Sequence, residues 1–600
     1  MAMEDRSCGG PEEFRFSPRP NRASEIGWLP WGEEAFSRSA REGKPVLLSI
    51  SAVWCHWCHV MDETTYSDPE VIDLVNRLYV PVRVDNDRHP DINRRYNQWG
   101  WPTTAFLSSR GALLAGATYI PPERMRLVLR RISELYALNR RELEDTPPVM
   151  EVSPPERENL TPSLVEKVAS SILTAWDREF GGLGAEPKFP HPEALTLALH
   201  AHRRGMGEEY LALVRESLEA MIYGNLRDRL EGGFFRYSTT RDWSVPHYEK
   251  MLADNAGLLS VLLRVYGATG KRLYLDTAKE TAAFIQRTLS DGRNRFFGSQ
   301  DADEEYYLLP RYARRARPAP PVDRTVYLDL SARAASSMLE AGTVLGNESY
   351  RRLSLGFLDF AWQECYLPEV GMAHYHDGSP RRHGLLDDQV ETALAFQTAF
   401  SLTGKPLYLE RAEDLLTLVR RHFWDGERKL LLDTTEGLSL PGLRPATADT
   451  ASASRAAECM LRQYFLGGEA EWLDLAAELL SSVAGDSLAG GYLAAPFALA
   501  LDLLLEGPLV VKIAGGDPEA RGAFLSAAVL SPDHRVIPLL EEGESGEPRS
   551  AGVEVCGREA CFLRTGRLEE LSTFLGLTWG IIMSKDEEEP GSSRVAFQEG

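Results

Sequence analysis

The spacing of hydrophobic residues divides the chain into three parts. Up to about residue 140, short apolar runs of strand length alternate with amphipathic helical segments, in the order strand, helix, strand, helix, hairpin, helix. From residue 161 to 506 the helical period of about 3.6 residues dominates. Beyond residue 506, two apolar strands flank one helix. The pattern predicts a multidomain chain with an α/β domain, a large all-α domain and a small C-terminal α/β appendage.

Composition marks the borders of these parts. Gly, Pro, Arg and Ser without a period predict a loosely held N-terminal segment, and two Pro-Pro pairs among acidic residues predict a linker. The final residues are acidic and polar, as in disordered tails. The expected division is 1–24 (extended segment), 25–145 (α/β domain), 146–160 (linker), 161–506 (helical domain), 507–584 (α/β appendage) and 585–600 (disordered tail).

The helical domain is expected to contain about twelve helices in six pairs. They begin near residues 162, 192, 209, 252, 273, 324, 348, 387, 407, 450, 469 and 493. The segment contains no recurring motif of the tetratricopeptide or armadillo kind, so an open solenoid is disfavoured. A closed (α/α)6 toroid is therefore the predicted architecture.

Composition also excludes some partners. With 43% hydrophobic and 26% charged residues, the chain has ordinary globular usage, and it lacks an apolar run near the roughly 20 residues of a membrane span. The net charge of -22 opposes binding to nucleic acid or to an anionic membrane. The first residues lack the basic and apolar stretches of a secretory signal, so a cytoplasmic location is expected.

The strongest chemical signal is the segment Trp54–His59, WCHWCH in one-letter code. A close cysteine pair in a reducing compartment indicates redox or metal chemistry. The segment follows a predicted strand and opens a helix, whose free N–H groups and dipole favour the thiolate of Cys55. We therefore predict Cys55 as the nucleophile and Cys58 as the resolving thiol. Trp101-Pro102-Thr103 precedes a strand, where thioredoxins place a cis-proline, so Pro102 and Trp57 are predicted to contact substrate.

Three other interpretations of the cysteine pair remain open. The pattern C-x-x-C-H also attaches haem covalently, but that requires export and a second axial ligand. Zinc binding by Cys55, His56, Cys58 and His59 is chemically feasible, although structural zinc sites usually take a second ligand pair from a distant segment. The two thiols could also be unreactive. We predict no metal site and no cofactor.

Four polar segments of the helical domain carry residues suited to catalysis or sugar binding. These are 188–191, 231–252, 296–303 and 385–388. Paired carboxylates can act as acid and base, and aromatic rings can stack on sugars. The candidates are His247, Glu249, Asp301 and Asp303 for catalysis, and Trp243, Asp254, Asp387 and Asp388 for substrate binding. The alternative is structural, with Asp387 capping a helix and Glu249-Lys250 forming ion pairs.

The cysteine run CHWCHVM, with WGEEAF at residues 31–36, Val84-Asp85 and Trp101-Pro102-Thr103, resembles spermatogenesis-associated protein 20 and its bacterial relatives. The resemblance extends over nearly the whole chain and implies a thioredoxin-like domain joined to a six-hairpin glycosidase-like barrel. The chain departs from the family after Asp303, and it has Asp323–Ser331 where relatives carry a Trp-Asn-Gly motif. These departures bring the barrel's ligand or activity into question.

Three functional hypotheses follow. The first is a dithiol/disulfide redox protein whose barrel recognises a protein disulfide or a small molecule. A carbohydrate-active epimerase or hydrolase is the second, with a sugar substrate, and a non-catalytic interaction scaffold is the third. Cys556 and Cys561 match a cysteine pair of the family, and they are predicted to be buried free thiols rather than a second redox or metal site.

Overall fold

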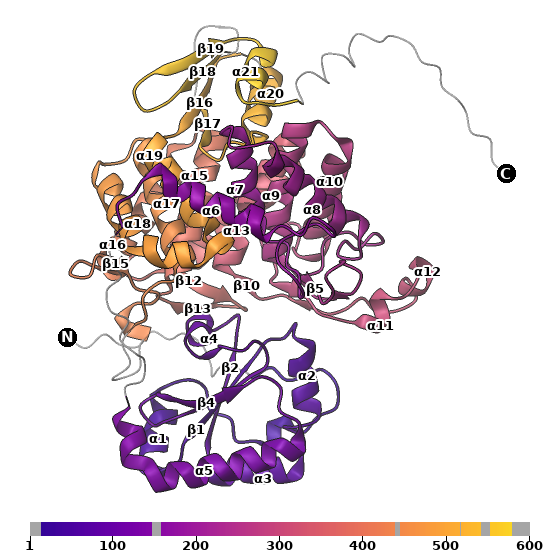
Figure 1. Ribbon diagram of the computed structural model, residues 1–600, viewed down its shortest axis with the longest axis vertical. Helices are drawn as coiled ribbons and strands as arrows, with labels where there is room; N and C mark the ends of the chain where they lie inside the picture. Colours follow the sequence, from indigo (N-terminus) through magenta and orange to yellow (C-terminus); the bar gives the residue numbers. More distant parts are fainter. Residues whose placement is uncertain (1–13, 147–157, 439–444, 517, 542–551, 579–600) are drawn as a thin grey trace, which may run out of the picture.

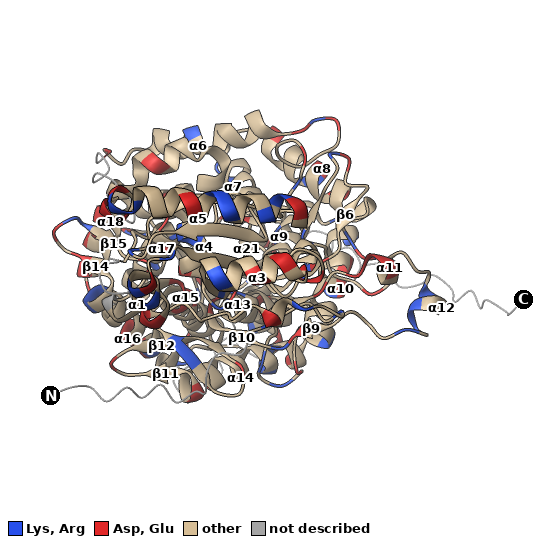
Figure 2. Ribbon diagram, turned by 90° about the horizontal axis from the view of Figure 1, so that it is seen from below, with Lys and Arg blue, Asp and Glu red and all other residues tan. Residues whose placement is uncertain are grey.

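The computed structural model describes residues 14–146, 158–438, 445–516, 518–541 and 552–578 (Figure 1). Three predicted parts lie wholly or partly outside these residues: the first 13 residues of the extended segment, most of the linker and the tail 585–600. Among the described helices, none combines the length and apolar content that a membrane crossing requires. Figure 2 shows acidic and basic residues interspersed along α5 (Pro122–Asp145) and across the rest of this view.

The first domain is a thioredoxin-like fold built on a four-stranded sheet in the order β2-β1-β3-β4. β1 pairs parallel with β2 and antiparallel with β3, which pairs antiparallel with β4. Because helices cover both faces, β1 and β2 are almost entirely buried, which explains their continuous apolar sequences. The strands are β1 (Val46–Ser51), β2 (Val80–Asp85), β3 (Thr103–Leu107) and β4 (Leu113–Ala117), and the remaining helices are α1 (Glu33–Glu42), α2 (His56–Glu63), α3 (Pro69–Leu78) and α4 (Pro90–Tyr96).

The single helix predicted after the cysteine motif is two helices, α2 and α3. Asp68 ends the connection between them, since its carboxylate accepts hydrogen bonds from the backbone N–H groups of Glu70 and Val71. Pro69 occupies the first position of α3, where a missing N–H has no cost. The cap and the proline therefore start a new helix at this point.

The second domain is a closed (α/α)6 barrel. Its inner helices pack each against the next, and the last packs against the first, which closes the ring. In chain order, each outer helix is followed by an inner one. The inner helices are α7 (Pro192–Arg203), α9 (Leu252–Thr269), α13 (Leu328–Val344), α15 (Leu386–Thr403), α17 (Thr450–Phe465) and α19 (Ala495–Glu506); the outer ones are α6 (Pro162–Ala175), α8 (Glu209–Tyr223), α10 (Arg272–Thr288), α14 (Glu348–Glu364), α16 (Pro406–His422) and α18 (Glu471–Ala489).

Short elements lie between the helices of the barrel, several of them where it meets the thioredoxin-like domain (Figure 1). One of them, β10, forms where the sequence predicts the start of a helix near residue 324, and α13 therefore begins only at Leu328. The strands are β5 (Tyr237–Ser238), β6 (Pro246–His247), β7 (Lys250–Met251), β8 (Ser299–Gln300), β9 (Val322–Asp323), β10 (Val326–Tyr327), β11 (Tyr366–Leu367), β12 (Gly371–His376), β13 (Pro380–His383), β14 (Trp424–Asp425) and β15 (Leu430–Leu431). The short helices are α11 (Glu304–Tyr307) and α12 (Arg311–Arg314), with 3-10 turns η2 (Glu436–Leu438) and η3 (Gly491–Ala494).

The thioredoxin-like domain docks on the end of the barrel formed by β10, β12 and β13, opposite the C-terminal appendage (Figure 1). Ion pairs between arginine and aspartate cross this interface: Arg382 contacts both oxygens of Asp91 at 2.7 Å, and Arg94 lies 2.6 Å from Asp387. His374 Nε2 lies 2.6 Å from the backbone oxygen of Asp87. These partly buried contacts fix the orientation of the two domains.

The N-terminal segment is not loosely held from residue 14 onward, which corrects the expectation for 1–24. Ser17 donates its backbone N–H to Asp62, which also forms a buried bidentate pair with Arg83 at 2.9 Å. Arg15 bridges the two domains, with Asp85 on one side and Asp323 on the other, each at 2.9 Å. A 3-10 turn, η1 (Ala23–Glu25), then places Ala23 in the core. These contacts use polar side chains, so hydrophobic periodicity does not reveal them.

The C-terminal appendage is a four-stranded sheet in the order β17-β16-β18-β19 with two helices. Cys556 and Cys561 face each other across the β18–β19 hairpin and form a disulfide, so the prediction of two free thiols is wrong. Hairpin pairing brings their Cα atoms to 3.8 Å. Cys365 and Cys459 are buried free thiols. The elements are β16 (Leu509–Ala514), α20 (Pro518–Val529), β17 (Val536–Leu540), β18 (Gly552–Cys556), β19 (Cys561–Thr565) and α21 (Leu568–Phe574).

Candidate functional site

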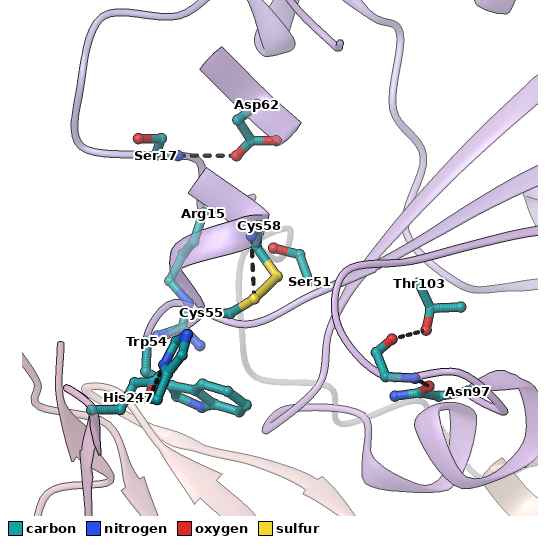
Figure 3. Close-up of a disulfide and its surroundings, with 12 residues drawn as sticks. Arg15, Ser17, Ser51, Trp54, Cys55, Cys58, Asp62, Asn97, Thr103 and His247 are labelled. Atoms are coloured by element: carbon teal, nitrogen blue, oxygen red, sulfur yellow. Dashed lines mark hydrogen bonds and ion pairs between the residues drawn. A yellow bond between two sulfur atoms is a disulfide. The ribbon is translucent and has the colours of Figure 1, made fainter. Parts of the chain in front are cut away.

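The cysteine pair lies at the N-terminus of α2 and is joined as a disulfide (Figure 3). Cys55 is the N-cap residue, and its Sγ accepts a hydrogen bond of 3.2 Å from the backbone N–H of Cys58. In the reduced protein, the same N–H and the helix dipole favour a thiolate at Cys55. Only 5% of Cys55 and 2% of Cys58 is exposed, so little of either sulfur-bearing residue reaches solvent.

Aromatic residues of the thioredoxin-like domain surround the pair. The peptide bond between Trp101 and Pro102 is cis, and Pro102 is buried. The rings of Trp54 and Trp101 meet edge to face, with centroids 5.5 Å apart. By contrast Trp57 is 49% exposed and packs on Tyr119, so it remains available at the surface. The predicted roles of Pro102 and Trp57 in substrate contact remain predictions.

The pair faces the barrel. Met251, from β7 of the barrel, packs against the cluster that contains Cys55 and Cys58. The guanidinium of Arg236, also from the barrel, lies over the ring of Trp54 at 4.3 Å and over that of Trp101 at 5.1 Å. Such cation–π contacts hold the two domains together beside the disulfide. The barrel thus forms one wall of the redox site.

Several predicted catalytic residues gather on this wall. His247 Nδ1 contacts the buried carboxylate of Glu249, and the imidazole stacks on Tyr237, with ring centroids 5.0 Å apart. β7 and β8 pair antiparallel, which places Asp301 near Glu249. Burial raises the pKa of Asp301 to about 7, and the charge of Glu249 adds to the shift. Together with the cysteines, these barrel residues form what we call the interface site.

Asp254 belongs to the same wall. Burial raises its pKa to about 7; Arg236 opposes the shift, while Glu193 and Glu249 increase it. A carboxyl group that titrates near neutrality can donate or accept a proton at pH 7, as general acids and bases do. The proximity of Glu249 to both Asp254 and Asp301 was not predictable from their positions in the sequence.

A hydrogen-bonded path leads from the cysteine motif into the barrel. Trp54 Nε1 donates to the Asp87 carboxylate at 2.7 Å, and the backbone oxygen of Asp87 contacts His374. Burial, together with the charges of Asp85 and Asp323, raises the pKa of Asp87 to about 7. His374 in turn lies 3.0 Å from Asp388. Sequence reasoning did not identify Asp87 or His374.

Other predicted residues lie apart from the interface site. Asp303 is the N-cap of α11 and accepts a hydrogen bond from Tyr306, so a structural role explains it. Asp387 pairs with Arg94 across the domain interface rather than capping its helix. Asp388 is fully buried against His374. Trp243 is also fully buried, with its indole N–H donated to Phe180, so the expectation that it stacks on a sugar is wrong.

The lumen of the barrel contains a cavity of about 360 Å³ that the sequence analysis missed. Its charged lining is internally paired: Glu391 accepts from Arg333 at 2.8 Å and from Arg455 at 2.9 Å, and Arg455 also contacts Glu458. None of the predicted catalytic residues is among the described residues that line it. The i, i+3 and i+7 spacing of Arg455, Glu458 and Arg462 on an inner helix is the sequence signal for this cluster.

We predict that Asp254→Asn stabilises the protein at alkaline but not at acidic pH. The folded-state pKa of Asp254, about 7, exceeds the ordinary value of 3.8, so burying its charge costs stability that grows as pH rises through this window. After allowance for solvent screening, the variant should gain about 2 kcal/mol at pH 8 and almost nothing at pH 4. Urea denaturation at both pH values measures this.

The control is Asp276→Asn, because Asp276 is exposed on α10 and makes only a 3.9 Å contact to Lys279. It should change stability little at either pH. A gain for Asp254→Asn that is equal at the two pH values would contradict the assignment.

Comparisons with known proteins match parts of the chain. The family model "Thioredox_DsbH: Protein of unknown function, DUF255" matches residues 19–151. Thiol:disulfide interchange protein DsbD of Yersinia pestis is 34% identical over 79 residues, 13% of each chain. The structure of cellobiose 2-epimerase from Bacillus thermoamylovorans B4167 has a TM-score of 0.44 and 12% identity, and the match covers 54% of this chain and 88% of that one.

Human spermatogenesis-associated protein 20 is 33% identical over 307 residues, which cover 46% of this chain and 39% of the human protein. The mouse and rat proteins match to the same extent. The aligned region thus spans about two fifths of the length of these relatives. Over that region the chain is a homologue of the spermatogenesis-associated protein 20 family, with a thioredoxin-like domain of the DUF255 type.

Proposed function

We propose that the protein is a dithiol/disulfide redox protein whose barrel encloses the Cys55–Cys58 pair and selects the substrate that reaches it. The observation that carries the proposal is the position of the cysteine pair. The pair lies at the start of α2, where Cys55 Sγ accepts a hydrogen bond from the Cys58 backbone N–H, and it packs against Met251 of the barrel. The chain is 34% identical over 79 residues to a protein named thiol:disulfide interchange protein, which supports disulfide chemistry at the cysteine pair.

The reaction needs only the two cysteines and a substrate disulfide. The Cys55 thiolate attacks one substrate sulfur, forms a mixed disulfide and releases the other substrate sulfur as a thiolate, which takes up a proton. Cys58 then loses its proton and attacks Cys55 Sγ, which frees the second substrate thiol. Two electrons pass from the protein to the substrate, and the reverse sequence oxidises a substrate dithiol.

Burial of the pair supports a narrow choice of substrates. With 5% of Cys55 and 2% of Cys58 exposed, the flat surface of a folded protein cannot reach either sulfur while the domains stay docked. A small disulfide or an extended peptide segment fits such a site better. His247, Glu249, Asp254 and Asp301 are the proposed groups for binding it and for moving protons at the thiols.

We predict one reversible two-electron transition when the full chain is equilibrated with oxidised and reduced dithiothreitol. Tryptophan fluorescence should report it, because Trp54 and Trp101 adjoin the pair. Cys55→Ser should abolish the transition, while Cys58→Ser should accumulate a mixed disulfide at Cys55 when oxidised glutathione is added.

The matched control is the double variant Cys556→Ser, Cys561→Ser, which removes the other disulfide at the far end of the barrel. It should leave the fluorescence transition unchanged. If wild-type protein shows no transition, or if Cys55→Ser keeps it, the redox proposal is wrong.

A second candidate function is binding of a small polar molecule, such as a sugar, in the barrel lumen. The 360 Å³ cavity favours it, because serine and threonine side chains line it beside the paired charges. Neither His247 nor any of the predicted carboxylates Glu249, Asp301, Asp303 and Asp388 is among the described residues that line this cavity. Binding without turnover is therefore the form of the sugar hypothesis that the geometry favours.

We predict that a panel of mono- and disaccharides contains a compound that raises the melting temperature of the full chain. The shift should disappear in Ser336→Leu, because Ser336 lines the cavity and leucine would fill part of it. Ser163→Leu, at an exposed position of α6, is the control and should keep the shift. If no compound of the panel raises the melting temperature, the sugar-binding hypothesis is wrong.

A further inference from the structure

Three metal-ligating side chains converge beneath the docked domain. Asp329 comes from the first turn of α13, His374 from β12, and Asp388 from the first turn of α15. One ligand atom from each lies within 4.8 Å of the other two. His374 and Asp388 are buried, so solvent does not screen the negative charge they enclose. No local sequence motif links these residues, because each lies on a different element.

The hydrogen bonds of His374 orient it as a metal ligand. Its Nδ1 points toward Asp388, at 3.0 and 3.1 Å from the two carboxylate oxygens. Its Nε2 lies 2.6 Å from the backbone oxygen of Asp87 and can donate a proton to it. Metal-binding histidines usually give one ring N–H to a carbonyl or carboxylate, which fixes the tautomer and leaves the other nitrogen for the metal.

Asp329 supplies an independent sign that a ligand is accommodated here. Its Oδ1 is buried and has no hydrogen-bond partner among the described residues. Such an oxygen is costly to bury alone, and a cation would satisfy it. Asp388 Oδ1 accepts a hydrogen bond of 3.3 Å from the backbone N–H of Asp329, which helps to orient this carboxylate.

We propose that Asp329, His374 and Asp388 bind one divalent transition-metal ion, with water or a ligand completing its coordination. One imidazole nitrogen and two carboxylates are a donor set suited to Zn²⁺ and to Mn²⁺ or Fe²⁺. Two carboxylates neutralise the dication, whereas the same carboxylates without it leave charge buried against a single histidine. The site is independent of the proposed redox function, since no cysteine belongs to it.

The position of the site links the two domains. His374 contacts the backbone oxygen of Asp87. The carboxylate of Asp87 accepts a hydrogen bond from the indole N–H of Trp54, the residue before Cys55. Asp329 lies one helical turn before Arg333, which lines the barrel cavity. A bound ion would therefore brace the docked domain at the mouth end of the lumen.

The test uses the full chain with both disulfides oxidised, so that the four paired cysteines cannot bind the probe, and Zn²⁺ alone as the probe. A chelator first removes any bound metal, and isothermal titration calorimetry should then give one equivalent of Zn²⁺ bound per chain. Asp329→Asn and Asp388→Asn should each weaken binding at least about 10-fold, on the scale of changes around metal ligands. The matched control is Asp276→Asn, an exposed acid of α10 that lies outside the cluster and outside the domain interface, and it should bind as wild type does.

A second measurement covers variants that fail to fold. Co²⁺ added to oxidised wild-type protein should give visible absorption bands of a nitrogen- and oxygen-ligated ion, and an equivalent of Zn²⁺ should displace them. The proposal is overturned if wild type binds no stoichiometric metal by either method. It is also overturned if Asp276→Asn weakens binding as much as folded Asp329→Asn or Asp388→Asn does.

Discussion

The arginine–aspartate pairs that dock the thioredoxin-like domain on the barrel are the constraint on which the site depends. Arg94 with Asp387, Arg382 with Asp91 and Arg15 with Asp323 join segments about 300 residues apart. They place the N-terminus of α2 against β7, and so turn a redox motif that ordinarily faces solvent toward the barrel. Without this docking, the two domains would be free to move independently of each other.

Enclosure changes what the cysteine pair can do. In an open thioredoxin-like domain, any accessible disulfide reaches the nucleophile, whereas here Met251 and Arg236 cover it. The barrel carboxyl groups Asp254 and Asp301 have pKa values near 7, and burial is the main cause of those values. Burial therefore restricts access to the cysteine pair and also raises the pKa values of these barrel carboxyl groups.

The sequence predicted the elements far better than it predicted the site. The helices α7, α8, α9, α14 and α17 begin where helical periodicity indicated, because local hydrophobic spacing determines where they form. The docking pairs, the Cys556–Cys561 disulfide and the contacts of Arg15 escaped prediction, since they join residues without any periodic relation. The prediction for Trp243 was wrong because the sequence around an aromatic residue with polar neighbours does not show whether its ring is exposed or buried.

The account's central claim is that docking shields the reduced cysteine pair, and the rate of Cys55 alkylation by iodoacetamide tests it most directly. Mass spectrometry of the Cys55 peptide separates it from the other thiols. We expect slow alkylation in wild type, and an increase of about 10-fold or more in Arg94→Glu, Arg382→Glu, which reverses two docking charges. Arg77→Glu, in an exposed pair with Asp73, should not change the rate. Fast alkylation in wild type, equal to that of the double variant, would contradict the claim.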